Sequence, residues 1–334
     1  MKHALITGGA GFIGSHLADF LIARDYRVTV IDDESTGSVE NLAGIRGHFN
    51  FSFVSGSVAD KALIRRLLAD VDEVYHLAAA VGVQLISTAP IHTIETNIYP
   101  TELLLSELLR RSRQGRPVKL FLASSSEVYG KNPKPRWNEE DDLVFGPTSR
   151  ARWSYGASKA IDEFLALAYY QEHQLPIVIG RFFNVAGPRQ SGQHGMVLPR
   201  FVEAALLGAP LLVHDDGQQT RCFCHVHDVV SAVTRLMDSP AAVAGVFNIG
   251  SDEPVTILHL AQRVITLARG GQGTITFQSY AEAYDNGFED VRNRAPDLTR
   301  IRALIGFEPS YTLDAIVTEV IEHMRTQLRR QAGG

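Results

Sequence analysis

The chain is poor in several features that mark particular classes of protein. Cysteine occurs only twice, at Cys222 and Cys224, and no apolar run reaches the roughly 18 residues that a transmembrane helix needs. The two cysteines share one face of a predicted strand, which argues against a structural disulfide. Charge of one sign gathers only in the short acidic run 139–142, and the formal net charge is −5. We therefore expect no nucleic-acid or membrane partner and a cytoplasmic location.

Apolar residues make up 45% of the 334 residues, enough for a large core. In the first half, short β-branched runs alternate with amphipathic helical patterns, which predicts an α/β fold with a doubly wound parallel sheet. Predicted strands span 3–6, 28–31, 51–54, 73–76, 119–123 and 177–180.

The pattern changes after Arg181, where loops rich in glycine and proline begin. We predict a helix at 199–207, strands at 211–213, 221–226 and 246–249, and further helices at 257–268, 298–305 and 313–325. The sheet domain is expected to comprise 1–182 plus 214–250. A second, smaller α+β substrate lobe is expected at 183–213 plus 251–330.

A glycine motif follows the first predicted strand. Gly8, Gly11 and Gly14 permit a tight turn, close approach of a pyrophosphate and close packing of the next helix, as in a Rossmann dinucleotide site. Asp32 ends the second strand, where a carboxylate can bind the ribose hydroxyls of the adenosine. Asp32 and Asp33 would also repel a 2′-phosphate, so the sequence predicts NAD as the cofactor. The alternative is a glycine-rich turn that binds no ligand.

A second motif places Tyr155 and Lys159 four residues apart, on one face of a predicted helix. The tyrosine pKa is ordinarily about 10. A nearby ammonium together with oxidised nicotinamide would lower this pKa, so that the phenol could act as a base. The alternative is that the pair has no catalytic role, because a tyrosine and a lysine at this spacing often lie on the solvent-exposed face of a helix.

The chain resembles the extended short-chain dehydrogenase/reductase family, that of the NAD-dependent epimerases and dehydratases, over nearly its whole length. The resemblance rests on the segments TGGAGFIG, VIDD, HLAA, SSSEVYG, YGASK, RFFNVAGPRQ, DGQQTRCFCHVHDV and NIGS. It implies that Ser125 works with Tyr155 and Lys159. It also implies nucleotide-sugar contacts at Asn184 and Arg221. Further cofactor contacts are implied at Phe12, Ile13, Asp33, Ser57, Val58, Leu77, Ala78 and Ala79, and a homodimer is implied through helices near 97–111 and 155–170.

Three segments resemble the UDP-glucuronate decarboxylases most: the one around Glu127, the segment RWSY that ends at Tyr155, and GFEDVRNRAPD. This resemblance implies that Glu127, Arg294 and Ser126 serve a decarboxylation that follows oxidation at C4 of the sugar. Arg294 could instead clamp the diphosphate, and Arg152 could approach the substrate or only begin a helix. A nucleotide-sugar 4-epimerase, a 4,6-dehydratase and a non-catalytic NAD-sensing protein remain alternatives.

Two departures from the family pattern are Phe288, where some decarboxylases have tyrosine, and Ser57, which replaces an aspartate that often contacts adenine. Four possible metal ligands, Cys222, Cys224, His225 and His227, alternate across the two faces of the predicted strand. They could not converge on one ion without a bulge, so we predict no metal site.

Overall fold

The computed structural model describes residues 1–80, 89–193, 195–283 and 289–332. A seven-stranded parallel sheet forms the larger lobe, in the order β11-β6-β5-β4-β1-β2-β3. Its strands are β1 His3–Thr7, β2 Arg27–Asp32, β3 Phe51–Ser55, β4 Glu73–His76, β5 Lys119–Ser125, β6 Ile177–Phe182 and β11 Val246–Ile249. The predicted doubly wound parallel sheet is confirmed, and β5 and β6 each run two residues further than expected.

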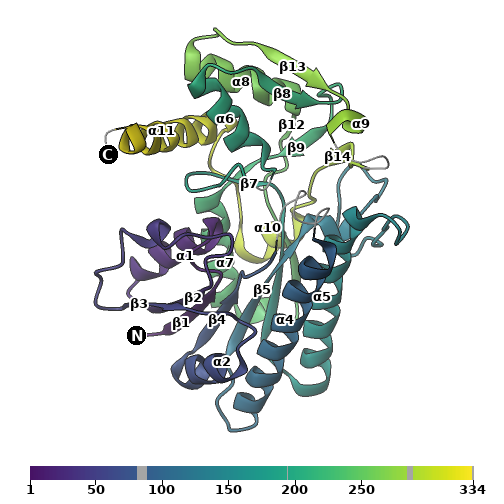
Figure 1. Cartoon of the computed structure of the whole chain (residues 1–334). Coiled ribbons are helices and arrows are strands. Elements are labelled where there is room, and N and C mark those ends of the chain that lie inside the picture. The colour runs from purple at the N-terminus through teal and green to yellow at the C-terminus, as the bar shows by residue number, and fades with distance from the viewer. Residues whose placement is uncertain (81–88, 194, 284–288, 333–334) are drawn as a thin grey trace.

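Alternate residues of each strand face opposite layers, because side chains along a strand point to the two faces in turn. Ile6 and Val30 pack on one face, towards α1 Phe12–Ile22 and α7 Val226–Asp238. Leu5 and Leu120 pack on the other face. That face is covered by α2 Lys61–Leu67, α4 Pro90–Ser112 and α5 Ser154–His173 (Figure 1). The carboxyl ends of the strands point towards the second lobe.

The second lobe has its own apolar core around Phe201, Leu260 and Val317. Its helices are α6 Val197–Leu207, α8 Ile257–Arg269, the short α9 Tyr280–Ala283 and α11 Leu313–Ala332. Strand β8 Leu211–His214 pairs with β13 Ile275–Gln278, and β9 Thr220–Cys222 pairs with both β12 Pro254–Thr256 and β14 Asn293–Arg294. In Figure 1 this lobe stands above the large sheet.

Two segments differ from the lobe assignment expected from the sequence. Strand β9 lies within 214–250, yet it pairs with strands of the second lobe. Helix α10 Thr299–Ile305 was expected in the second lobe, but its Ile301 packs in the core beside the large sheet. The chain therefore crosses between the lobes more often than the expected boundaries allow.

The predicted strand 221–226 is wrong as a single element. It breaks at Phe223 into β9 and the two-residue strand β10 Cys224–His225, which pairs with β7 Val185–Ala186. His227 then lies in α7, whose first residue is Val226. We predicted no metal site because side chains along a strand alternate between its two faces. That argument does not apply to His227, since this residue lies in a helix.

The remaining elements of the described residues are short 3-10 helices at Val39–Leu42, Leu68–Asp70, Ser126–Tyr129, Ala151–Trp153 and Pro240–Ala242. Within the described ranges, no helix combines the length and the apolar character that crossing a bilayer requires.

Candidate active site

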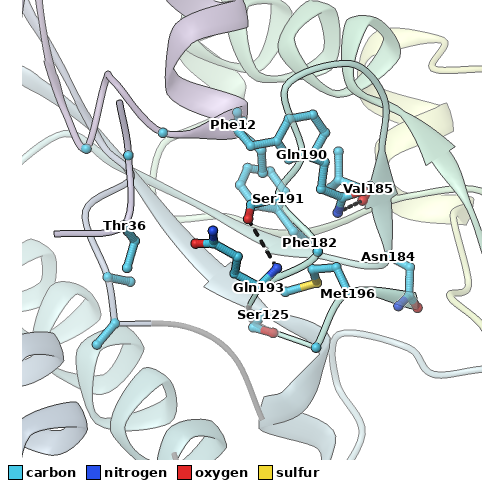
Figure 2. A pocket seen from close by; sticks show the side chains of 18 of the residues that line it. Phe12, Thr36, Ser125, Phe182, Asn184, Val185, Gln190, Ser191, Gln193 and Met196 are labelled. Carbon is cyan, nitrogen blue, oxygen red and sulfur yellow. Dashed lines mark hydrogen bonds between the residues drawn. The ribbon is translucent and has the colours of Figure 1, made fainter. Parts of the chain in front are cut away.

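A cavity of about 1010 Å³ lies between the two lobes, at the carboxyl ends of the sheet strands. Its lining runs from the glycine turn after β1 to Met324 and Gln327 of α11. All of the predicted site residues line it except Lys159, which is buried behind the lining. In Figure 2, Thr36, Ser125 and Asn184, from three separate segments, line this one cavity.

One end of the cavity has the geometry that a dinucleotide needs. Gly8 has a φ of 67°, and a Cβ at Gly14 would lie 2.3 Å from the Gly8 carbonyl oxygen, so α1 begins directly against the turn. Gly11 caps α1 without a side-chain hydrogen bond, which leaves backbone N–H groups of the first turn to face an anion. These features and the adjoining carboxylate of Asp32 fit NAD.

Asp32 is fixed by its own backbone surroundings. Its Oδ2 accepts a hydrogen bond from the Ala10 N–H at 2.9 Å, and its Oδ1 accepts one from the Glu34 N–H at 2.8 Å. Burial raises its pKa, although these two N–H groups oppose the shift. The predicted cofactor contacts Phe12, Ile13, Asp33, Ser57, Val58, Leu77, Ala78 and Ala79 line the same end of the cavity.

Tyr155 lies at the opposite end of this region, on the first turn of α5. A Cβ at Gly156 would lie 2.4 Å from the Glu127 carbonyl oxygen, so glycine lets α5 pack tightly on the turn after β5. Tyr155 shares a hydrogen bond with Ser125, the last residue of β5. Burial and the Glu127 carboxylate raise the pKa of Tyr155. The protein groups alone therefore do not lower this pKa, and the lowering expected from Lys159 together with oxidised nicotinamide stays a prediction.

The Lys159 ammonium is bound by a residue that sequence reasoning missed. Its Nζ lies 2.8 Å from Oδ2 of Asp162, three residues later on α5. The side chain of Asp162 is fully buried. The spacing of three between opposite charges on a helix was the available signal.

Glu127 lies between two guanidinium groups. Arg152, in the 3-10 helix before α5, donates to both carboxylate oxygens at 2.6 and 3.1 Å. Arg294 of β14 approaches Glu127 Oε1 at 2.7 Å. Burial works to raise the pKa of Glu127, but Arg294 and Arg152 overcome it and hold this pKa well below its usual range. The structure thus brings Glu127 and Arg294 together and adds Arg152, which the sequence left open.

Arg294 is anchored to the first lobe although it belongs to a strand of the second. The Trp137 N–H donates to the Ala295 carbonyl at 2.9 Å, and the Asp297 N–H donates to the Trp137 carbonyl at 2.8 Å. Trp137 is buried among Tyr129 and other aromatic side chains of the first lobe. The backbone that follows Arg294 is therefore tied to the segment between β5 and α5.

Arg221 and Asn184 line the second-lobe side of the cavity. The Arg221 Nη2 lies 2.9 Å from each oxygen of Asp290, whose Oδ2 also accepts a hydrogen bond from the Tyr280 hydroxyl at 2.7 Å. A diphosphate at Arg221 would therefore share it with a carboxylate that the sequence did not reveal. The buried Oδ1 of Asn184 has no hydrogen-bond partner within the described part of the chain, and it is available to a ligand.

Both cysteines are buried free thiols. The described residues contain no group of three or more His, Cys, Asp or Glu side chains that could hold a metal ion. Phe288, noted in the sequence for its missing hydroxyl, lies outside the described residues.

Comparison with known proteins adds a family and relatives. A family model described as GDP-mannose 4,6 dehydratase matches residues 5–320. A UDP-N-acetyl-α-D-glucosaminuronate decarboxylase of Bacillus cytotoxicus is 38% identical over 97% of this chain and 98% of its own length. UDP-glucuronic acid decarboxylase 1 of Xenopus tropicalis is 34% identical over 99% of this chain and 74% of its own length.

The fold also matches solved structures. The UDP-glucuronic acid 4-epimerase of Bacillus cereus, solved in complex with UDP-glucuronic acid and NAD, superposes with a TM-score of 0.86. It is 26% identical, and the match covers 98% of this chain and all of the epimerase chain.

Proposed function

The chain belongs to the extended short-chain dehydrogenase/reductase family, in the branch described as GDP-mannose 4,6 dehydratase, and from this premise we propose that it is a UDP-glucuronate decarboxylase. It is an NAD-dependent enzyme that acts on nucleotide sugars. The alternative of a non-catalytic NAD-sensing protein loses support, because the relatives and structural neighbours of this chain are enzymes. The cytoplasmic location stays a prediction.

One observation supports a sugar acid as the substrate, and the decarboxylase relatives favour loss of its carboxylate. Glu127 and two guanidinium groups lie together at the sugar end of the cavity, next to Tyr155. A bare 4-epimerase needs only removal and return of hydrogen at C4, for which Ser125, Tyr155 and Lys159 suffice. A sugar acid brings a carboxylate that needs a cationic partner, and Arg294 supplies one.

The first step belongs to Tyr155 and Ser125. Tyr155 removes the proton from the C4 hydroxyl, and Ser125 holds that hydroxyl in place through a hydrogen bond. Bound NAD supplies the acceptor for the hydride that leaves C4. Residues Gly8, Gly11, Gly14 and Asp32 would hold the pyrophosphate and the adenosine ribose.

The second step uses Arg294, Glu127 and Ser126. A C4 ketone makes the sugar acid a β-keto acid, so the C5–C6 bond breaks, CO₂ leaves and its bonding electrons form an enolate. Arg294 grips the carboxylate before it leaves. Because its pKa is held low, Glu127 acts as an anion that orients Arg294. C5 must then take up a proton, and the buried Ser126 hydroxyl, which also lines the cavity, relays it from a solvent water and so regains the proton that it gives.

The decisive experiment incubates the purified protein and NAD with UDP-glucuronate, UDP-N-acetylglucosaminuronate and UDP-glucose in turn. Mass spectrometry of the products should show loss of CO₂ from UDP-glucuronate, and Tyr155→Phe should abolish it. If CO₂ is released only from UDP-N-acetylglucosaminuronate, the substrate is instead the one for which the Bacillus cytotoxicus relative is named. A product that keeps all six sugar carbons would instead establish a 4-epimerase, which is the activity named for the Bacillus cereus neighbour, or a 4,6-dehydratase.

We further propose a homodimer that forms through α4 and α5. These two helices pack against each other, and their outer faces expose Ile94, Tyr99, Ile161 and Phe164. Phe164 is 70% exposed, an unusual position for a large aromatic side chain unless a partner covers it.

A further inference from the structure

The ion pair between Lys159 and Asp162 is almost completely buried, although the proposed reaction assigns no role to Asp162. The side chains of Lys159 and Asp162 are 3% and 0% exposed, and Nζ lies 2.8 Å from Oδ2. Removing a carboxylate from water is costly unless a cation offsets the loss of hydration. Burial raises the pKa of Asp162, while the charge of Lys159 and the Thr101 hydroxyl oppose that shift. Asp162 is therefore the direct counter-ion of the lysine that adjoins the proposed base.

Several other charged and titratable groups face this pair. From β4, His76 is held neutral: burial and the charge of Lys159 lower its pKa to about 3. From α5, Glu163 is already paired with Arg181 of β6 at 2.7 Å. Glu127, from the turn after β5, pairs with both Arg294 of β14 and Arg152, so this group keeps one positive charge in excess. Among these groups, Asp162 is the one in contact with Lys159.

We propose that Asp162 is a positioning residue that anchors Lys159 and keeps Tyr155 protonated until positively charged nicotinamide lies beside it. This inference rests on the proposed function. An isolated ammonium projects a full positive charge towards the phenol, whereas an ammonium paired with a carboxylate projects a dipole whose effect falls off faster with distance. Tyr155 therefore becomes a base only when the oxidised cofactor is bound. Without the cofactor, its phenol stays protonated.

The first test measures ionisation without turnover. The phenolate absorbance of the NAD complex is measured against pH for the wild type and for Asp162→Asn. For each protein, the absorbance of the matching complex with Tyr155→Phe is subtracted, so that only the Tyr155 signal remains. Asparagine keeps the shape of the side chain and removes its charge. The Tyr155 midpoint should shift to lower pH by about one unit. Glu172→Gln, an exposed carboxylate on the same helix, should leave it unchanged. An unchanged or raised midpoint in folded Asp162→Asn would overturn the proposal.

The second test measures the pH dependence of kcat/KM with UDP-glucuronate. The acidic limb should shift in the same direction, so that Asp162→Asn is about fivefold faster than the wild type at a pH one unit below the wild-type midpoint. A loss of rate at every pH without such a shift would reduce Asp162 to a structural role and refute the proposal. If the wild type acts on none of the three nucleotide sugars, the proposed function fails, and the phenolate titration still decides the role of Asp162.

A double-mutant cycle covers the case in which Asp162→Asn folds poorly. Lys159→Met should lower the unfolding midpoint in urea, because it leaves Asp162 buried without its cation. Adding Asp162→Asn to Lys159→Met should restore part of that loss. If the two substitutions instead lower stability additively, the ion pair is not the interaction that the structure indicates, and the proposal falls.

Discussion

Replacement of Arg294 by glutamine should separate catalysis from stability. Arg294 is 8% exposed and makes one contact of 2.7 Å with Glu127, while Arg152 makes two. Removing one partner of a buried ion pair costs about 3–5 kcal/mol when the remaining charge has no other partner. Here Glu127 keeps Arg152, so we expect Arg294→Gln to lower the free energy of unfolding by about 1–2 kcal/mol. Arg152→Gln should cost more, because it removes two of the three contacts.

The effect of Arg294→Gln on the reaction should be much larger. Loss of a charged contact to the reacting carboxylate should reduce CO₂ release about 10²- to 10³-fold. Formation of NADH should fall less, because Tyr155 and Ser125 are unchanged, so the 4-keto sugar acid should accumulate. The assay follows CO₂, NADH and unfolding in urea for each variant. Arg292→Gln is the matched control, since Arg292 lies two residues away, is 54% exposed and pairs with Asp216. CO₂ release within threefold of the wild type in Arg294→Gln would refute the reasoning.

Three further changes test other parts of the structure. Gly14→Ala places a Cβ 2.3 Å from the Gly8 carbonyl oxygen, so NAD affinity measured by calorimetry should fall at least about tenfold, whereas Gly44→Ala, with no atom within 4 Å, should not change it. Phe164→Arg should convert a dimer into a monomer in sedimentation velocity; a monomeric wild type, or a variant that stays dimeric, would contradict the proposed interface. The hydrogen bonds from Arg65 lower the pKa of Glu107 from 4.5 to about 2. Glu107 should therefore stabilise the fold above its unfolded pKa, and this contribution should be lost as the pH falls towards 2. Because Arg65 is half exposed to solvent, Glu107→Gln should cost only about 1–3 kcal/mol at neutral pH, and a difference that persists at pH 2 would contradict this account.

Local patterns were enough to predict the sheet and the two motifs at its edge. The strand candidates and Gly8, Gly11 and Gly14 follow from periodicity and turn chemistry, which act over a few residues. The placement of α10 and the break at Phe223 do not, because each depends on which distant strand or core is available. Strand β9 pairs with β14 from 73 residues later, and no local signal records that pairing.

The site shows the same division. Tyr155 and Lys159 were predictable because they share one helix. The contacts of Arg152 and Arg294 with Glu127 join three segments, and the contact of Asp290 with Arg221 joins residues 69 positions apart. Only the fold reveals such charge pairs. The raised pKa of Tyr155 has a different main cause, because burial raises it most and the Glu127 carboxylate adds to that effect.

The backbone tie between Trp137 and the residues after Arg294 makes the reacting end of the cavity a pivot. If the second lobe swings, Arg294 and Glu127 keep their spacing, because the chain is pinned there to the sheet. The gap widens instead at the far rim, beside α11. A nucleotide can then enter and leave at that rim while the groups that act on the sugar acid stay assembled.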